Sequence, residues 1–187
     1  MQIVKSRLYV AFLLSPITII HFLVYKFSKK RSVIQSDLPG KIFFLYHIIY
    51  DKPYRNLFYY RVGKSHFLFS WILPRCPYTK INQKMKLGRH CEMEHAFNTF
   101  LNGQKIGDNF KCYHNVTIGN KGGQLPIIGN NVIISCGASV LGNVRIGNNV
   151  IIGAGCVVVK DVPDNCTVIG NPAKIVRKDG KKVDINL

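Results

Sequence analysis

The chain has 187 residues, enough for one domain with a small appendage, and 47% of them are hydrophobic, enough for a packed core. Its formal net charge is +17, and residues 1–80 carry most of the excess, with 13 Lys and Arg against two acidic residues. Such a charge indicates nucleic acid, anionic lipid or an acidic ligand. The sequence has no zinc finger, RNA-recognition aromatic motif or long basic helix, which argues against nucleic acid.

The first predicted element is the uncharged stretch 8–25, which is followed by a basic run at 26–31. Eighteen residues are short for a membrane span, and Pro16 and His21 weaken that interpretation. No small-residue cleavage site is evident, so a secretory signal peptide is not indicated. Three alternatives stay open: an interfacial or re-entrant membrane helix, a span with its basic flank in the cytoplasm, and a helix buried in an oligomer.

A second apolar stretch covers 41–63, with the aromatic-rich text "YRNLFYYRVG" at its end. Arg55 and Arg61 lie among these aromatics, so the stretch predicts either a helix at a lipid surface or a helix packed on the neighbouring domain. Two prolines in 73–79 predict a linker. We therefore expect 1–78 to be an N-terminal helical segment, with a membrane surface as a possible partner.

From Leu87 onward the sequence repeats every six residues. Aliphatic residues recur at Ile128, Ile134, Val140, Ile146, Ile152 and Val158. Small or β-branched residues, or cysteine, follow each by four positions, at Val132, Ala138, Val144, Val150, Cys156 and Val162. The same spacing holds for Ile106/Phe110 and Cys112/Val116, and a fainter version is Leu87/Cys91 and Met93/Phe97. Both positions of the repeat are predicted to point inward.

A six-residue unit suits a short strand plus a corner, because Val and Ile favour strands while Gly and Asn tolerate tight corners. Three units make a triangular coil, and stacked coils make a parallel β-helix. We predict this mainly β fold over 79–163, with a cap and tail at 164–187. A ten-residue step from Ile118 to Ile128 predicts a loop at 120–126.

The six cysteines are predicted to be small apolar core residues of a reducing compartment, since several fall on inward positions and none forms a CxxC motif.

His95 and His114 are each the third residue of a six-residue unit. Their separation of 19 corresponds to one 18-residue coil plus one extra residue before Ile106, which predicts that they lie one coil apart on the same face. An imidazole has an ordinary pKa of about 6.5 and can take a proton from an alcohol at neutral pH. Glu94 or Glu92 could orient the ring. The alternative is that both histidines are solvated or core residues.

Two further alternatives concern other classes of protein. His90, His95 and His114 could ligate a metal ion, as in carbonic anhydrases built on hexapeptide repeats, although His114 is poorly placed, and we predict no metal site. The repeat could also be a scaffold without catalysis.

From about Thr79 to Lys178, the text "MEHAFNTFLNGQKIGDNFKCYHNVTIGNKGG…IGNPAKIV" resembles the serine acetyltransferase-like branch of the hexapeptide-repeat acyltransferases. The resemblance implies a left-handed β-helix, homotrimers with sites between subunits, and acetyl-CoA as donor. His95 occupies the place of that family's catalytic base, and Glu94 that of the acidic residue before it. His114 is a further candidate catalytic residue.

The same resemblance predicts a CoA site in the last coils. Ala154 would contact the pantetheine arm, Gly153 would permit close approach, and cations would meet the phosphates at Lys160, Lys174 and Arg177.

Two departures bear on the acceptor. Lys80 stands where serine acetyltransferases have an aspartate, and "QLPII" replaces their "RHPKI", so the second histidine is missing. Short relatives with an N-terminal segment like "YRNLFYYRVG" decorate capsule or lipopolysaccharide sugars. We therefore expect an acetyl-CoA-dependent O-acetyltransferase of saccharides at the cytoplasmic face of the membrane, with serine O-acetylation for cysteine synthesis as the alternative.

Overall fold

The computed structural model describes residues 48, 51–68, 70–71 and 73–187. The chain forms two compact units, 1–76 and 77–187. The predicted segment 8–25 lies outside the described residues, and the predicted domain boundaries after 78 and 163 stay predictions. No helix in the described part is both long and apolar enough to span a bilayer.

The described part of the first unit contains one capped helix. Helix α5 (Lys52–Val62) is followed by the 3₁₀-helix η1 (Gly63–Leu68). The Asp51 carboxylate accepts a hydrogen bond from the Tyr54 backbone N–H at 3.1 Å, which satisfies a free donor at the start of α5. Gly63, with a φ of 65°, ends the helix.

The arginines of α5 are buried. Arg55 and Arg61 are both 4% exposed. The Arg55 guanidinium donates from Nε to the Ile48 carbonyl at 2.7 Å and from Nη1 to the Pro74 carbonyl at 2.8 Å. Burying a guanidinium costs much free energy unless its donors are paired, and these two bonds pair two of the Arg55 donors. These two side chains therefore do not form the exposed cationic face that contact with a lipid surface requires.

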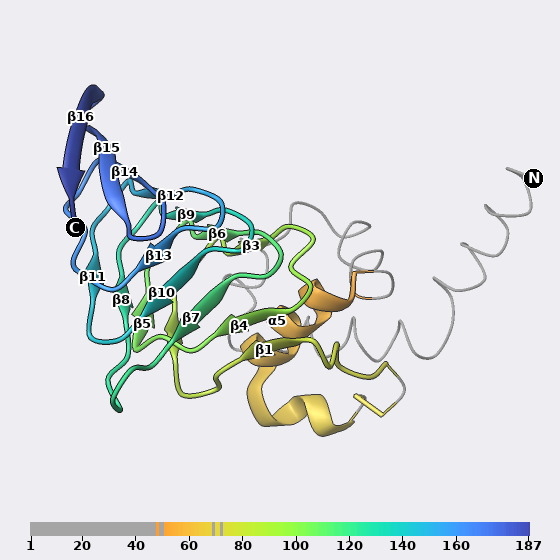
Figure 1. Cartoon of the computed structure of the whole chain (residues 1–187). Helices are drawn as coiled ribbons and strands as arrows, with labels where there is room; N and C mark the ends of the chain where they lie inside the picture. Colours follow the sequence, from red (N-terminus) through yellow and green to blue (C-terminus); the bar gives the residue numbers. More distant parts are fainter. Residues whose placement is uncertain (1–47, 49–50, 69, 72) are drawn as a thin grey trace, which may run out of the picture. The chain divides into compact units, whose positions relative to one another are not determined.

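The second unit is a triangular stack of short strands, and each wall takes every third strand (Figure 1). The first wall contains β1 (Thr79–Ile81), β4 (Thr99–Leu101), β7 (Thr117–Gly119), β10 (Ser139–Leu141) and β13 (Val157–Val158). The second contains β2 (Lys86–Leu87), β5 (Lys105–Ile106), β8 (Ile127–Ile128) and β11 (Arg145–Ile146). The third contains β3 (Glu92–Met93), β6 (Lys111–Cys112), β9 (Ile133–Ile134), β12 (Ile151–Ile152), β14 (Cys166–Ile169), β15 (Lys174–Lys178) and β16 (Lys181–Asn186).

The core of this unit consists of the two inward positions of the repeat. The six aliphatic residues at 128–158 and the six that follow them by four positions are all 3% exposed or less. Burying such side chains in register stabilises each coil by roughly 1.5–3 kcal/mol per residue. The predicted fold class, a mainly β left-handed parallel β-helix, is confirmed.

A turn lies within the predicted loop at 120–126. The register pairs Ile106 with Ile128, and Ile128 in turn with Ile146. The first of these two steps along the chain is longer than the second by four positions, so the coil that contains the loop is larger. Lys121 and Gln124 form an isolated bridge across a turn. Gly122 and Gly123 take φ values of 64° and 84° there, which glycine adopts without strain.

The predicted inward pair Met93/Phe97 is wrong at its second position. Met93 is buried, but Phe97 is 52% exposed, and Ala96 and Thr99 fill the interior instead. The coil is wider here because it contains extra residues, so the residue four positions after Met93 no longer points into the interior.

The extra residue before Ile106 is present, and it is the net result of two changes. Met93 pairs with Cys112, one position beyond a regular coil of three six-residue units, whereas Leu101 pairs with Ile118, one position short of it. Two residues are therefore added at the corner between β3 and β4. One fewer residue lies between Leu101 and Ile106 than a regular six-residue step requires. The net excess between Met93 and Ile106 is one residue, as predicted, and it arises from the corner that carries His95.

The C-terminal end departs from the repeat. Strand β14 still pairs in parallel with β12, but β15 and β16 turn back as antiparallel strands. They extend the third wall with a hairpin.

All six cysteines are free thiols, and only Cys136 is not fully buried. Burial raises the pKa of the Cys112 thiol to about 12 and that of Cys156 to about 11. They behave as the small apolar core residues that the sequence predicts.

Candidate active site

His95 lies at the corner that follows β3. It is exposed, and its backbone is left-handed, with a φ of 48°. The Phe97 N–H donates to the His95 carbonyl at 2.6 Å, so the chain turns tightly and then makes the two-residue detour described above. A left-handed histidine is uncommon outside turns, and here the corner requires it.

The corner with His114 stacks on the corner with His95. Glu94 N–H donates to the Cys112 carbonyl at 3.0 Å, and Asn115 N–H donates to the Phe97 carbonyl at 2.9 Å. Together with the β3–β6 register, these bonds place the two histidines on adjacent coils at the same edge. The predicted one-coil relation is therefore confirmed, while the catalytic roles of both residues stay predictions.

The same edge continues to the corner of Ala154. Gly137 N–H donates to the His114 carbonyl at 3.0 Å, and Gly155 N–H donates to the Cys136 carbonyl at 2.9 Å. The corners after β3, β6, β9 and β12 thus form one continuous column. With roughly 4.8 Å between coils, the first and last of these corners lie about 14 Å apart along the stack.

Glu94 is held by an ion pair within this site. The Lys111 ammonium lies 2.5 Å from Glu94 Oε2 and 3.2 Å from Glu92 Oε1, and 5.2 Å from the centre of the Tyr113 ring. The hydrogen bond from Lys111 is the main cause that lowers the pKa of Glu94, and the charge of His95 adds to it. The bonds to Glu94 and Glu92 raise the pKa of Lys111.

Sequence reasoning missed Lys111. A signal was present, because Glu92 and Lys111 are 19 residues apart, the same spacing as His95 and His114. Two outward residues of opposite charge at this spacing are in-register neighbours on adjacent coils.

Strand β1 packs under the His95 corner. The Thr79 hydroxyl donates to the Ala96 carbonyl at 2.6 Å. Lys80, the next residue, is exposed and lies opposite Phe100 of β4. A cation thus occupies the strand position where the resembling enzymes have an aspartate.

Gly153 has a structural reason to be glycine. An added Cβ would lie 2.8 Å from Ile169 Cγ2 and 3.3 Å from the Val168 carbonyl oxygen, closer than side chains tolerate. Ala154 follows it at the exposed corner, where Gly155 has a φ of 65°. The packing of β14 alone therefore explains Gly153, whereas Ala154 is free to contact a ligand.

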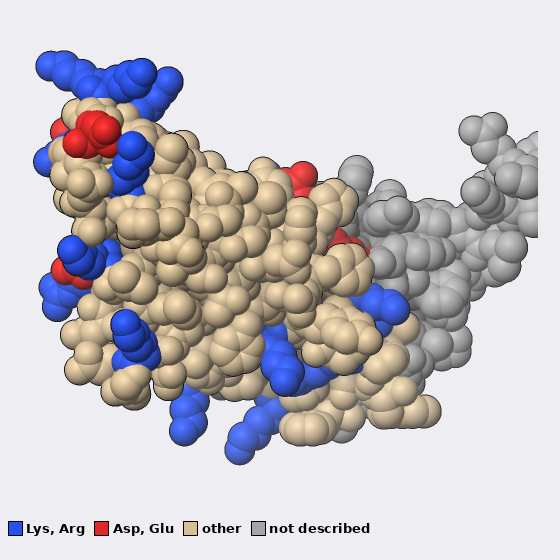
Figure 2. Space-filling model, in the orientation of Figure 1, with Lys and Arg blue, Asp and Glu red and all other residues tan. Residues whose placement is uncertain are grey.

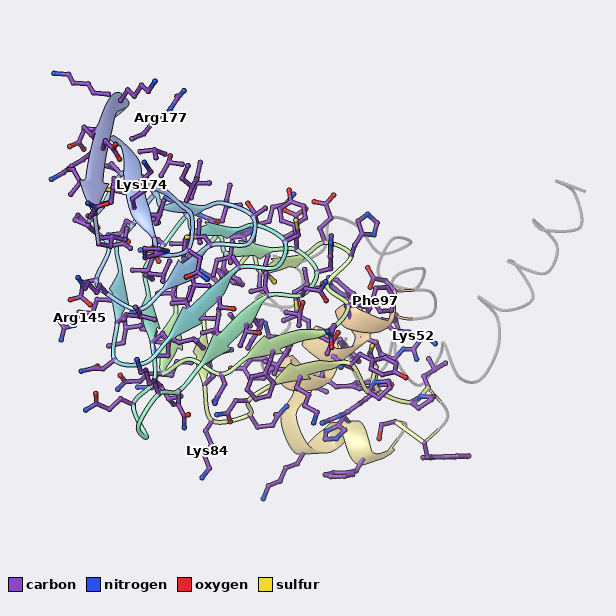
Figure 3. The ribbon with its side chains drawn as sticks, viewed as in Figure 1. Lys52, Lys84, Phe97, Arg145, Lys174 and Arg177 are labelled. Atoms are coloured by element: carbon purple, nitrogen blue, oxygen red, sulfur yellow. The ribbon has the colours of Figure 1, made fainter. Side chains whose placement is uncertain are left out.

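The predicted phosphate-binding cations lie near the C-terminal end. Lys160 is exposed, and Lys174 pairs with Asp184 at 2.9 Å. Lys174 and Arg177 project from β15 at the opposite end of the stack from Phe97 (Figure 3). Lys and Arg side chains gather at the tip of the β15–β16 hairpin (Figure 2), where the exposed cations are Arg177, Lys178, Lys181 and Lys182.

The three histidines of the metal alternative do not all lie at one edge of the stack. His90 lies at the corner after β2, a different edge from that of His95 and His114. Within the described residues, no three His, Cys, Asp or Glu side chains are close enough together to hold a metal ion.

Comparison with known proteins gives consistent matches. Residues 126–160 match the family of bacterial transferase hexapeptide repeats. A serine acetyltransferase of Synechococcus elongatus is 35% identical over 136 residues, which cover 64% of this chain and 56% of that protein. The chain spans between 50% and 65% of the length of the curated serine acetyltransferases it matches.

Solved structures agree with the sequence matches. The apoenzyme of soybean serine acetyltransferase is 30% identical, with a TM-score of 0.64 over 78% of this chain and 68% of that one. Serine acetyltransferase from Brucella abortus in complex with coenzyme A is 27% identical, with a TM-score of 0.67 over 84% of this chain and 72% of that one. Fold, repeat and relatives coincide, and the chain belongs to the hexapeptide-repeat acyltransferase family.

Proposed function

We propose that this chain is an acetyl-CoA-dependent O-acetyltransferase and that L-serine is its acceptor. The relatives and solved structures named above are serine acetyltransferases, and this supports the acceptor better than a saccharide. The observation that carries the proposal is the single column of corners from His95 through His114 to Ala154.

That column suits a long, thin donor. The pantetheine arm of acetyl-CoA would lie along it, with its amides beside Ala154 and its thioester toward His95. The phosphates would then lie toward the cations of the last coils, at Lys160 and Arg177, with Lys174 shared with Asp184. The Brucella abortus relative, solved with coenzyme A, supports this class of donor.

The reaction requires one proton acceptor. The imidazole of His95 would take the proton of the acceptor hydroxyl as its oxygen attacks the thioester carbonyl. The new C–O bond forms, the C–S bond breaks, and the proton passes from the imidazolium to the departing CoA thiolate. Backbone N–H groups of the corners would stabilise the oxyanion of the tetrahedral intermediate. The homotrimer implied by the resemblance would bring cofactor groups of a neighbouring subunit to His95.

A saccharide hydroxyl is a second candidate acceptor, favoured by two specific features. Lys80 replaces the aspartate of the resembling enzymes, and the loop at 120–126 ends in "QLP" without their second histidine. Both differences change the side chains that could bind a free amino acid such as serine. A sugar acceptor would fit a membrane-peripheral location on the cytoplasmic side.

An assay of CoA release separates these possibilities. Purified full-length protein is given acetyl-CoA with L-serine, or with a panel of nucleotide sugars and oligosaccharides. We expect CoA release that depends on L-serine and the formation of O-acetylserine. Release with a sugar but not with serine would reject the serine proposal and support the second candidate. No acceptor-dependent release at all, with coenzyme A unbound in calorimetry, would reject the acetyltransferase.

A further inference from the structure

We propose that Lys111 is a positioning residue of this site: it fixes the Glu94 carboxylate beside His95 and offsets the negative charge that Glu94 would otherwise place next to the imidazole. The inference rests on the proposed role of His95 as the base. The resemblance to serine acetyltransferases assigns no role to Lys111 or to its contact with Glu94.

The geometry sets Lys111 apart from an ordinary surface lysine. It stands on β6, opposite Glu92 on β3, and its ammonium reaches both Glu92 and Glu94. Its side chain is 25% exposed, the least of any in the ion pairs between described residues, where the others are 36% to 73% exposed. Partial burial between two carboxylates and the Tyr113 ring immobilises the lysine and, with it, Glu94.

Several charged or titratable groups surround the His95 corner. Glu92 lies on β3, and Glu94 directly follows that strand. Lys111 lies on β6, and Tyr113 and His114 follow it at the stacked corner. Lys80 lies on β1, which packs beneath the His95 corner. Glu94 is the immediate chain neighbour of His95, and the charges of the two interact. The cation on β6 is the group that engages Glu94 directly.

The consequence has a definite sign. A carboxylate beside an imidazole favours the protonated, charged ring, and a nearby ammonium disfavours it. Removing the ammonium would expose the Glu94 charge and delay deprotonation of the ring, so the acidic limb of the pH–rate profile would move to higher pH.

Four variants test this, and Lys111→Met, which keeps the apolar stem, is the first. The pH–rate profile of kcat/KM is measured from pH 5 to 9 for each variant, and the value at pH 6 is divided by the plateau value of the same protein. This ratio should be roughly threefold lower in Lys111→Met than in the unmodified protein. Lys111→Arg, the matched control, should keep the original profile. In the double variant Lys111→Met/Glu94→Gln, the acidic limb should return toward its position in the unmodified protein, because both charges are removed. Glu94→Gln alone removes the negative charge next to His95 and leaves the Lys111 ammonium in place, so the acidic limb of the profile should move to lower pH.

A readout independent of turnover separates this inference from the proposed function. The His95 ring is titrated by NMR in protein labelled at histidine, with its signal assigned through His95→Asn. The same shifts are expected whether or not an acceptor is known. A loss of thermal stability in Lys111→Met without any movement of the profile or of the ring titration would reduce Lys111 to a structural ion pair and overturn the proposal. If Lys111→Met fails to fold, Lys111→Gln takes its place in both measurements.

Discussion

At the scale of single residues, His95 and His90 share an unusual conformation. Both are exposed and left-handed, with φ values of 48° and 54°. For most side chains this region costs roughly 1–2 kcal/mol, but asparagine tolerates it. Asparagine occupies the left-handed position at other corners, including Asn131 and Asn149. Substitution by asparagine therefore removes an imidazole without adding backbone strain.

We predict that His95→Asn lowers kcat at least about a hundredfold, since a positioned base contributes roughly 10²–10⁴ to the rate. The matched control is His90→Asn, which changes the same residue type in the same backbone conformation at another edge. Steady-state CoA release measures both. Equal activity of the two variants would remove His95 from the mechanism.

The repeat made His95 and Glu94 predictable, because counting in units of six places them at a corner. The partner of Glu94 was harder to predict. Lys111 lies beside Glu92 only because this coil is one residue longer than a regular one, the net of two residues added at one corner and one omitted before Ile106. The choice between Glu94 and His95 as its neighbour depends on side-chain packing. A six-residue period constrains inward residues strongly and outward residues weakly.

At the scale of the elements, coils stack so closely that some corners exclude any side chain. A Cβ on Gly129 would lie 2.6 Å from the Gly147 carbonyl oxygen and 2.8 Å from its carbonyl carbon, both backbone atoms of the next coil. Backbone cannot move aside without shifting the coil, so the strain spreads through the stack.

We predict that Gly129→Ala lowers the free energy of unfolding by about 1–3 kcal/mol, the usual range for overpacking. Gly119→Ala is the matched control, because the nearest atom to its Cβ would be Leu141 Cδ2, at 3.5 Å, an ordinary contact. Urea unfolding measures both variants. A larger loss for Gly119→Ala than for Gly129→Ala would contradict the stacking of these coils.

The strands themselves followed from the sequence, and the hairpin of β15 and β16 did not. Antiparallel strands alternate with a period of two, so the six-residue count gives no signal beyond β14. Arg177 pairs with Lys182, and Lys178 with Lys181, across that hairpin. Like charges directly opposite each other are unfavourable, and this favours an anionic ligand there.

At the scale of the whole molecule, the proposed site lies along one edge of the triangular stack. The proposed base lies at one end of a column of corners, and the basic hairpin lies at the other end of the stack (Figures 1 and 3). The fold was predictable because its core repeats. The acceptor was not, because Lys80 and the loop at 120–126 are outward features that the repeat leaves unconstrained.

The most direct test of a transfer site along this edge is an experimental structure of the protein with coenzyme A. We predict that the pantetheine arm runs along the corners of Ala154 and His114 and that its sulfur lies beside the His95 imidazole. Coenzyme A bound along either of the other two edges, with its sulfur away from His95, would contradict the proposed site.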